Sequence, residues 1–179
     1  MNKLPENFEL ERYGLHCRLV NEDDAEFILN LRLTQGQFVH ATDADISKQI
    51  EWMRNYKKRE KEGLDFYFMF LLEGERIGVH RIYNVNWERL SFTGGSWFCK
   101  PDTPMQYVAL TSYLTDEIAF DILGLKINLY DVRKGNKKVL RFHRDIACAI
   151  EYGETELDYL FYVTDKTREN NQIKILFNL

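Results

Sequence analysis

An unbroken apolar run from Phe66 to Leu72 most constrains what this chain can fold into. Such a run, bounded by polar segments, is typical of a strand that is buried on both faces of a sheet. The turn Glu73-Gly74-Glu75 and the polar loop at 84–89 separate it from two further strands, expected at 76–83 and 90–100. Strands joined by such short connections predict an antiparallel meander in the middle of the sheet.

Helices and strands are expected on either side of this meander. A strand at 13–20 leads into the polar run Asn21-Glu22-Asp23-Asp24, which can cap a helix and place acids at its positive end. A second helix should begin at Ser47 and end at Gly63, and a longer one should span 105–123. The remaining expected elements are a strand at 126–132, a helix from Asn136, strands at 147–152 and 157–163, and an alternating tail at 171–179.

The tail is expected to add an edge strand or to pair with a partner chain, which would make a homodimer. Taken in order, the elements predict one domain, 1–179, of the α+β class. Its central mixed β-sheet would carry helices on both faces.

Charge and cysteine content exclude several functional classes. The net charge of −4 lacks the basic surplus of proteins that bind nucleic acid through its phosphates. Cys17, Cys99 and Cys148 are far apart, which argues against a disulfide framework or a zinc cluster, so no metal site is expected. No apolar stretch is long enough to cross a bilayer. We expect a cytoplasmic protein without nucleic-acid or membrane partners.

Several motifs, taken in order, resemble the GNAT acetyltransferases from about residue 13 to residue 164. The opening CRLV at 17–20 and the helix start after it are similar to that superfamily's first strand and helix, and ERIG at 75–78 is similar to its meander. The stretch IAFDILGL at 118–125 is similar to the end of its cofactor helix. Asn136 begins NKKVLRFH, which is similar to the segment in which family members carry an asparagine that contacts CoA.

The resemblance implies a GNAT-type fold and an acetyl-CoA-dependent N-acetyltransferase, closest to the amino-sugar and ribosomal-protein branch. The sequence departs from the family at the pyrophosphate signature Q/R-x-x-G-x-G/A, because the aligned stretch at 101–109 has no glycine. A helix N-terminus still offers free amides to phosphate, so we expect cofactor contacts from Tyr107, Val108 and Ala109. The alternative is a catalytically inert GNAT-like CoA-binding module.

The pair Gly94-Gly95 lies inside the third strand of the meander, where it predicts a bulge or a close approach to a ligand. A bulge frees backbone amides that can bind a thioester carbonyl or the pantetheine arm. The resemblance places this strand against the cofactor, so the expected contacts are Gly95, Ser96, Trp97 and Phe98. The competing interpretation is that the glycines only relieve crowding against an aromatic side chain.

His143 stands where family members carry the tyrosine that protonates the leaving thiolate. The ordinary pKa of histidine, about 6.5, suits this transfer near neutrality, although a helical histidine without a role is an equal alternative. Thr93 occupies the family's usual position for a carboxylate base, so the candidate bases are His80 and Glu88, acting through water. A core position for His80 is the competing interpretation.

The loop at 34–45 separates the first two helices, and the family's substrate contacts come from this region. Its polar side chains, which suit a cationic amine or a sugar amine, are Gln35, His40, Thr42, Asp43 and Asp45. Cations at the end of the second helix form a solvated face, or alternatively meet a substrate phosphate; they are Lys57, Lys58, Arg59 and Lys61. These features favour a nucleotide-linked amino sugar or another small amine as acceptor, with a protein N-terminus as the alternative.

Overall fold

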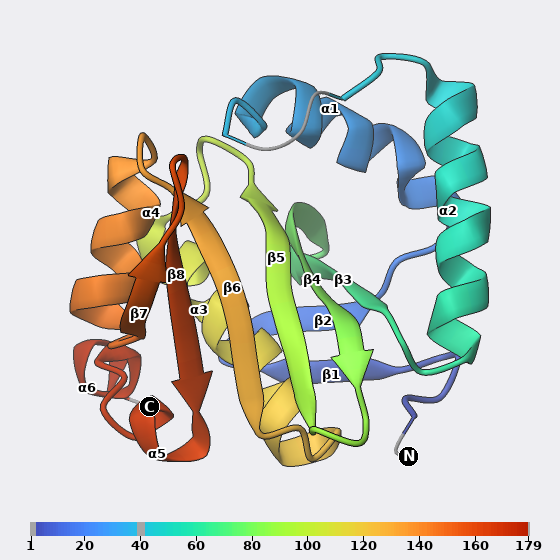
Figure 1. The fold of residues 1–179 in the computed structure, drawn as a ribbon. Coiled ribbons are helices and arrows are strands. Elements are labelled where there is room, and N and C mark those ends of the chain that lie inside the picture. The colour runs from blue at the N-terminus through green and yellow to red at the C-terminus, as the bar shows by residue number, and fades with distance from the viewer. Residues whose placement is uncertain (1–2, 39–41, 179) are drawn as a thin grey trace.

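In the computed structural model, which describes residues 3–38 and 42–178, one curved mixed sheet lies between two sets of helices (Figure 1). The strands are β1 (Glu9–Arg12), β2 (Leu15–Leu19), β3 (Phe66–Leu72), β4 (Glu75–Asn86), β5 (Ser91–Cys99), β6 (Ile127–Arg133), β7 (Ile150–Glu154) and β8 (Asp158–Thr164). The helices are α1 (Ala25–Gln35), α2 (Ile46–Lys61), α3 (Met105–Glu117), α4 (Lys137–Arg141), α5 (Asp165–Arg168) and α6 (Ile173–Phe177). A 3₁₀ turn, Glu22–Asp24, precedes α1, and π-helical turns extend α3 to Ile122 and α4 to Ile146.

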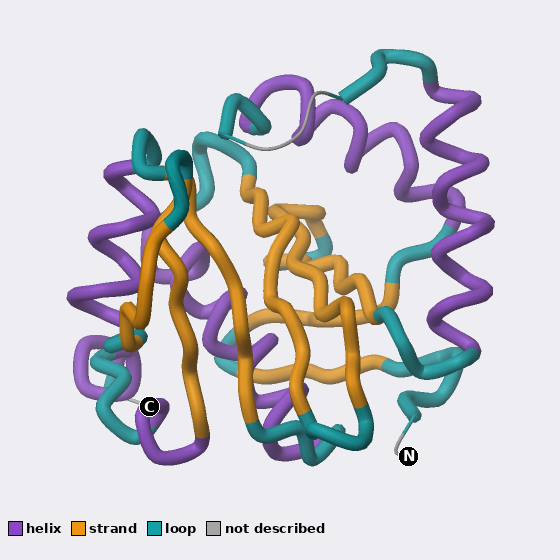
Figure 2. The backbone as a smooth tube through the Cα atoms, in the orientation of Figure 1, coloured by secondary structure: helices purple, strands orange, loops and turns teal. Residues whose placement is uncertain are grey.

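The described strands form one sheet in the order β1-β2-β3-β4-β5-β6-β8-β7, and Figure 2 shows them as a continuous layer. Neighbouring strands are antiparallel except for β5 and β6, which are parallel. The predicted meander is confirmed as β3, β4 and β5. Because one parallel pair joins two antiparallel halves, the sheet is mixed, as expected.

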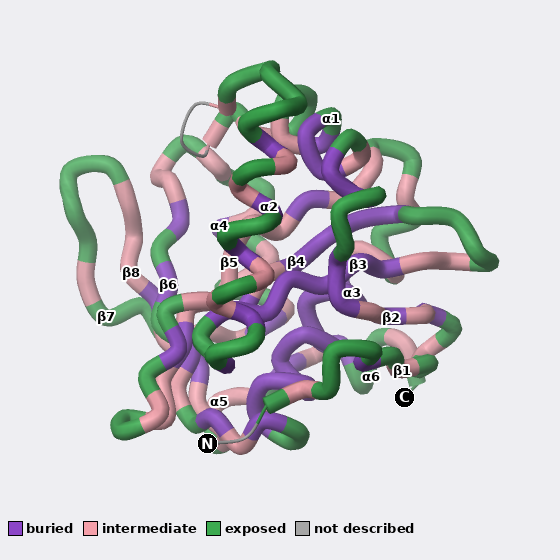
Figure 3. The backbone as a smooth tube through the Cα atoms, turned by 90° about the vertical axis from the view of Figure 1, so that its right-hand side faces the viewer, coloured by how far each residue is buried: buried purple, intermediate pink, exposed green. Residues whose placement is uncertain are grey.

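Apolar clusters cover both faces of the sheet. On one face, Phe68 and Phe70 of β3 pack in the same cluster as Leu114 of α3. On the other face, Tyr67 of β3 packs in a cluster with Met53 of α2. The buried segments therefore gather along β3, β4 and α3, while the outer side of α2 and most of β7 are exposed (Figure 3). The apolar run of β3 is buried on both faces, as predicted.

Among the boundaries that differ from the sequence-based expectation, two have a clear local cause. The strand expected at 13–20 begins only at Leu15, as β2, because Tyr13 and Gly14 adopt positive φ angles, 56° and 75°, and form the turn that joins it to β1. The cap of α2 is Asp45 rather than Ser47: the Asp45 carboxylate accepts the N–H of Ser47 at 2.8 Å. Gly63, also at positive φ, follows the end of α2 as expected.

The prediction that the tail forms a strand is wrong, because the tail contains the short helix α6. Asn171 accepts the N–H of Ile173 at 2.9 Å through its side chain and so initiates the turn. Ile173 is fully buried while Ile175 is 72% exposed. Residues two apart point to opposite sides of a helix, so the alternation reflects one buried turn and not a strand face. The tail therefore offers no strand through which the expected homodimer could pair.

Candidate active site

Strands β5 and β6 separate soon after they begin. Their pairing covers only Ser91 with Ile127 and Phe92 with Asn128, and beyond these residues the strands diverge (Figure 1). The second half of β5 therefore has a free edge facing the gap in the ladder. Backbone N–H and C=O groups along such an edge can hydrogen-bond to an extended ligand.

The predicted bulge lies in this second half of β5. Arg81 of β4 faces Gly95 and Val79 faces Phe98, so two residues of β5, Ser96 and Trp97, lie opposite a single residue of β4. Ser96 adopts a φ of 48°, in the left-handed region that non-glycine residues rarely occupy. Strained backbone of this kind is concentrated at functional sites, and here it releases backbone groups beside the free edge.

Gly94 is fixed by a contact across the gap. Its N–H donates to Oδ1 of Asn128 at 2.8 Å, and Nδ2 of Asn128 donates to Oδ1 of the buried Asp116 at 3.4 Å. A Cβ atom at Gly94 would lie 2.9 Å from Nδ2 of Asn128, so only glycine fits without displacing that side chain. Burial raises the pKa of Asp116 to about 7, against the opposing effects of Arg168 and Asn128.

Gly95 meets an aromatic side chain, as the competing interpretation of the glycine pair supposed. A Cβ atom there would lie 3.0 Å from both Cε1 and the hydroxyl of Tyr83. The glycines therefore provide room for neighbouring side chains, and the bulge itself lies one residue further along. Tyr83 is thereby held against the backbone of β5 next to the bulge.

Three of the predicted residues come together on the face covered by α3 and α4. Trp97 donates its ring N–H to Thr111 of α3 at 2.9 Å, and its ring centroid lies 5.7 Å from that of His80 and 6.1 Å from that of His143. His143 Nδ1 lies 2.9 Å from the hydroxyl of Tyr130 on β6. Trp97 thus joins β5 to α3 and to the segment that carries His143.

Both histidines are neutral at pH 7. Burial lowers the pKa of His143 to about 3, and burial together with His143 lowers the pKa of His80 to about 3. The expectation that His143 titrates near neutrality is therefore wrong, and a neutral imidazole is a hydrogen-bond partner rather than a stored acid. His80 is a core residue, 7% exposed, and its Nδ1 has no hydrogen-bond partner in the described structure.

The opposite face of the sheet carries a polar group that the sequence did not single out. Tyr130 points to the α4 side, so its neighbour Asp131 lies on the side of α1 and α2. Arg81 lies over the Trp52 ring of α2, at 5.0 Å, and over the Tyr83 ring, at 4.7 Å, which places Tyr83 on that same side. Burial and the charge of Asp131 raise the pKa of Tyr83.

Asp131 and Tyr83 therefore lie on the same face of the sheet, near enough for the charge of Asp131 to act on the Tyr83 hydroxyl. One signal of this group was present in the sequence. Asp131 follows Ile127 and Leu129 on one face of an alternating strand, where a charged residue interrupts an apolar series.

The N-terminus of α3 follows directly after β5. The amides of Tyr107 and Val108 both donate to the carbonyl of Pro104, at 2.9 and 3.2 Å, so the helix itself uses them. The amides that remain directed out of the helix are those of Met105 and Gln106, nearer its end than expected. Ala109 is buried in the core.

Two other expected cofactor contacts lie at element ends or in the core. Asn136 caps α4, accepting the N–H of Val139 at 3.4 Å, and its amide nitrogen remains available for a ligand. The Phe98 side chain is 6% exposed and packs in the cluster under α1 and α2, so this residue presents only its backbone to the strand edge.

The structure separates Glu88 from this group. It lies in the exposed turn between β4 and β5, at the end where β5 and β6 are still paired (Figure 1).

Most of the polar side chains expected to meet an acceptor have partners within the protein. In the loop before α2, Asp43 pairs with Lys48, and Asp45 caps the helix. His40 lies outside the described residues. The basic cluster at the end of α2 is also paired, with partners Glu60 for Lys57, Asn55 for Lys58, Asp65 for Arg59 and Glu6 for Lys61. The solvated-face interpretation of that cluster is the one the contacts support.

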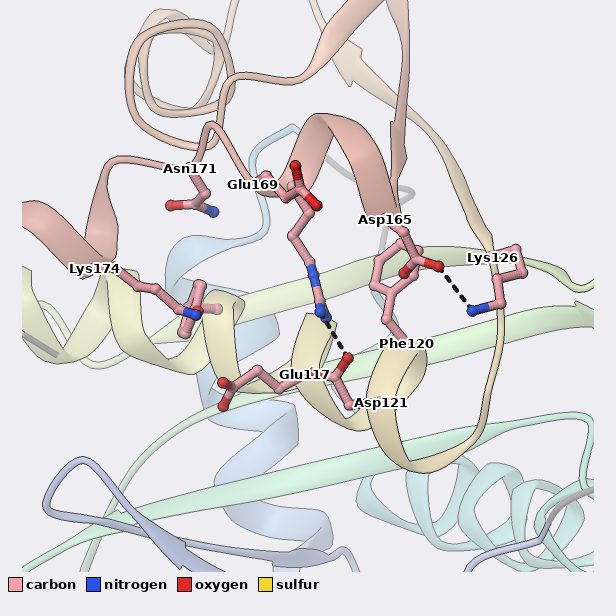
Figure 4. A pocket seen from close by; sticks show the side chains of 10 residues that line it. Glu117, Phe120, Asp121, Lys126, Asp165, Glu169, Asn171 and Lys174 are labelled. Atoms are coloured by element: carbon pink, nitrogen blue, oxygen red, sulfur yellow. Dashed lines mark hydrogen bonds and ion pairs between the residues drawn. The ribbon is translucent and has the colours of Figure 1, made fainter.

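A separate hollow of about 290 Å³ lies between α3 and the C-terminal helices (Figure 4). Its charges are largely paired: Arg168 contacts Asp121 and Lys126 contacts Asp165, each at 2.7 Å. These pairs attach the C-terminal segment to α3 and to the start of β6, away from the β5–β6 opening. Within the described residues, no group of three or more His, Cys, Asp or Glu side chains could hold a metal ion, and no helix is long and apolar enough to cross a membrane.

Comparison with known proteins gives a consistent result at the level of structure. Neither the models of protein families nor the curated protein sequences give a match. Among solved structures, apo FdhC, described as a nucleotide-linked sugar GNAT, is 32% identical with a TM-score of 0.82, over 96% of this chain and 98% of that one.

More distant structures share the fold. The spermidine/spermine N-acetyltransferase SpeG from Vibrio cholerae is 16% identical, with a TM-score of 0.74, over 89% of this chain and 98% of that one. The ribosomal-protein-S5-alanine acetyltransferase from Vibrio fischeri is 14% identical, with a TM-score of 0.75, over 89% and 97% of the two chains. With a parallel pair that opens beside a bulged strand, and with 32% identity to a GNAT over almost its entire length, this chain belongs to the GNAT superfamily of acetyltransferases.

Proposed function

We propose that this chain is an acetyl-CoA-dependent N-acetyltransferase whose acceptor is the amine of a nucleotide-linked amino sugar. The observation that carries the proposal is the β5–β6 opening, where a bulge and a free strand edge lie beside a carboxylate on β6. The class of acceptor is supported by the likeness to a nucleotide-linked sugar GNAT along nearly the whole of both chains.

The residues at this opening fit an acyl-CoA. A pantetheine arm is an extended chain with amide groups, so it can continue the ladder along the free edge of β5, from Gly95 to Phe98. The N-terminus of α3 has backbone amides, at Met105 and Gln106, that point out of the helix, and its first turn carries no acidic residue. Both features suit a pyrophosphate. Asn136 would add a side-chain amide at the start of α4.

Asp131 is the group we assign to take the proton from the acceptor ammonium. It lies on the face of the sheet opposite Trp97 and His143, so acceptor and acyl donor would approach the opening from different sides. A carboxylate accepts such a proton directly or through one water molecule. Tyr83 keeps its proton, because burial and Asp131 raise its pKa, and it can donate a hydrogen bond that orients the acceptor.

Bound acetyl-CoA supplies the electrophilic thioester carbon. Backbone amides freed at the bulge, at Ser96 and Trp97, would stabilise the oxyanion as the amine adds. When the carbon–sulfur bond breaks, a proton from the amine nitrogen passes to sulfur. His143 is neutral and hydrogen-bonded to Tyr130. It would stabilise the leaving sulfur by donating a hydrogen bond, while the proton itself comes from the amine nitrogen.

An acceptor panel tests the proposal. CoA release and acetylated products would be measured with a nucleotide-linked amino sugar, the same amino sugar without its nucleotide, spermidine and a peptide with N-terminal alanine. We expect kcat/KM to be highest for the nucleotide-linked sugar. Acetylation of the peptide alone would favour a protein N-terminal acetyltransferase, and CoA binding without any turnover would identify an inert CoA-binding module.

The role of Asp131 has its own test within the same assay. We expect Asp131→Asn to lower kcat by about 100-fold or more, the usual contribution of a general base. Glu88→Gln serves as the matched control and should leave kcat unchanged, because Glu88 lies at the paired end of β5 and β6. A loss of activity in Glu88→Gln with full activity in Asp131→Asn would assign the base to Glu88 instead.

A further inference from the structure

A buried tyrosine hydroxyl lies under the helices on the acceptor side of the sheet. Tyr67 of β3 is 1% exposed, and its hydroxyl has no hydrogen-bond partner within the described structure. Its ring packs edge-on against Trp52 and Tyr56 of α2. Leaving a hydroxyl buried and unpaired costs free energy that a ligand acceptor can recover.

An arginine of α1 lies close enough to this hydroxyl for its charge to act on it. Arg32 of α1 stacks over the Phe98 ring at 5.8 Å, and its Nε donates to the Thr42 hydroxyl at 3.1 Å. In the part of the chain that the structure describes, no Asp or Glu pairs with Arg32. Its terminal nitrogens, in the fork geometry that matches phosphate, are therefore available for a ligand.

Further positive charge surrounds the same hydroxyl. The charges of Arg32, Arg81 and Asp65 all act on Tyr67. Asp65 is shared between two arginines: Nε of Arg81 donates to its Oδ1 at 2.7 Å and Nε of Arg59 to its Oδ2 at 2.9 Å. Asp65 is thus shared between two guanidinium groups, and neither of them belongs to Arg32.

We propose that Arg32, Arg81 and the Tyr67 hydroxyl form a binding site for the diphosphate of the acceptor. The inference rests on the proposed function and extends it by placing the nucleotide-bearing end of the substrate. A diphosphate, which carries more than one negative charge, suits Arg32 and Arg81 together better than a single carboxylate does. The site lies on the α1–α2 face, whereas the N-terminus of α3, which suits the pyrophosphate of CoA, belongs to the other layer.

The position along β5 agrees with this assignment. Phe98, under Arg32, is two residues beyond Ser96 of the bulge, which corresponds to about 7 Å along a strand. That separation is comparable with the span from the anomeric phosphate to an amine on the far side of a pyranose ring. A diphosphate held by Arg32 would thus leave the amine near the bulge, Tyr83 and Asp131.

The test uses the full chain saturated with CoA, so that nucleotide probes cannot occupy the CoA site. Uridine diphosphate, thymidine diphosphate, inorganic pyrophosphate and succinate would be titrated calorimetrically into wild type, Arg32→Gln, Tyr67→Phe and the control Arg54→Gln. Arg54 is an exposed arginine of α2 that pairs with Glu22. We expect a diphosphate to bind, with Kd raised tenfold or more by Arg32→Gln and two- to tenfold by Tyr67→Phe, and unchanged by Arg54→Gln.

Tyr67→Phe also has a readout that a purely structural role would not give. Because the hydroxyl has no hydrogen-bond partner among the described residues, its removal should leave the unfolding midpoint unchanged or raise it, while weakening the binding of the diphosphate. Absence of diphosphate binding, equal Kd values in wild type, Arg32→Gln and Tyr67→Phe, or succinate bound as tightly as diphosphate would each overturn the proposal. Activity with a simple amine in the same preparations separates this failure from failure of the proposed acetyl transfer.

Discussion

Replacing the buried carboxylate of Asp116 should stabilise the protein at high pH, whereas replacing an ordinary hydrogen-bonded residue usually lowers its stability. Asp116 is 8% exposed, and its side chain contacts the amide of Asn128 at a long 3.4 Å. Burial raises its pKa to about 7, well above the value of about 3.9 for an unfolded chain. The native state therefore binds this proton more tightly, and the stabilisation is lost as the pH rises towards 7.

The size of the effect follows from this pKa difference. Compared with a side chain that stays protonated, the Asp116 carboxyl lowers the free energy of unfolding by about 1.5 kcal/mol at pH 5 and by about 4 kcal/mol at pH 8. Asp116→Asn keeps an acceptor oxygen for Asn128 but cannot ionise. We therefore expect the variant to be more stable than wild type at pH 8, with a stability difference that grows by about 2–3 kcal/mol between pH 5 and pH 8.

Urea denaturation of both proteins at pH 5 and pH 8 measures this difference directly. Other titrating groups, including the buried histidines, affect both proteins alike and cancel in the comparison. A variant that is less stable than wild type at pH 8, or a stability difference that does not change with pH, would show that the ionised Asp116 does not destabilise the native state. The first result would mean that the ionised carboxylate is required to hold Asn128 and, through it, Gly94.

Two further predictions concern neighbouring residues. Gly94→Ala should lower the free energy of unfolding by about 1–3 kcal/mol, because its Cβ would displace Asn128 and break the 2.8 Å bond to the Gly94 N–H; an unchanged denaturation midpoint would contradict this. The pKa of His80, lowered to about 3, predicts that native stability is lost as the pH falls below the unfolded value of about 6.5. His80→Phe should remove about 2 kcal/mol of the loss between pH 7 and pH 5, and denaturation curves of equal pH dependence in both proteins would disprove it.

The parts of the fold that could be read from the sequence are those in which local pattern and burial agree. The apolar run of β3 had one reasonable explanation, a strand covered on both faces, and α3 showed a helical stripe ending at a glycine. The bulge was also predictable, because a glycine pair inside a strand indicates crowding or a broken ladder. Both effects occur there: the side chains of Asn128 and Tyr83 crowd Gly94 and Gly95, and the ladder is broken at Ser96.

The acceptor side of the site could not be read in the same way. Asp131 and Tyr83 lie 48 positions apart, and only the order of the strands brings them together on one face of the sheet. Arg32 and Tyr67 likewise meet through the packing of α1 on the sheet, which no local pattern encodes. The prediction of a strand in the tail was wrong for a local reason. The five residues of α6 are too few for the pattern to distinguish a helical turn from an alternating strand.

Binding of acetyl-CoA, followed by calorimetric titration and by a thermal melt, is the decisive property to measure, because the proposed amine chemistry depends on a cofactor site that lacks the family's glycines. We expect saturable binding and a raised unfolding midpoint, since ligand at 100 times its Kd stabilises the native state by about 2.7 kcal/mol. An unchanged midpoint and no binding heat at millimolar acetyl-CoA would contradict this expectation, and the β5–β6 opening would then serve a different ligand.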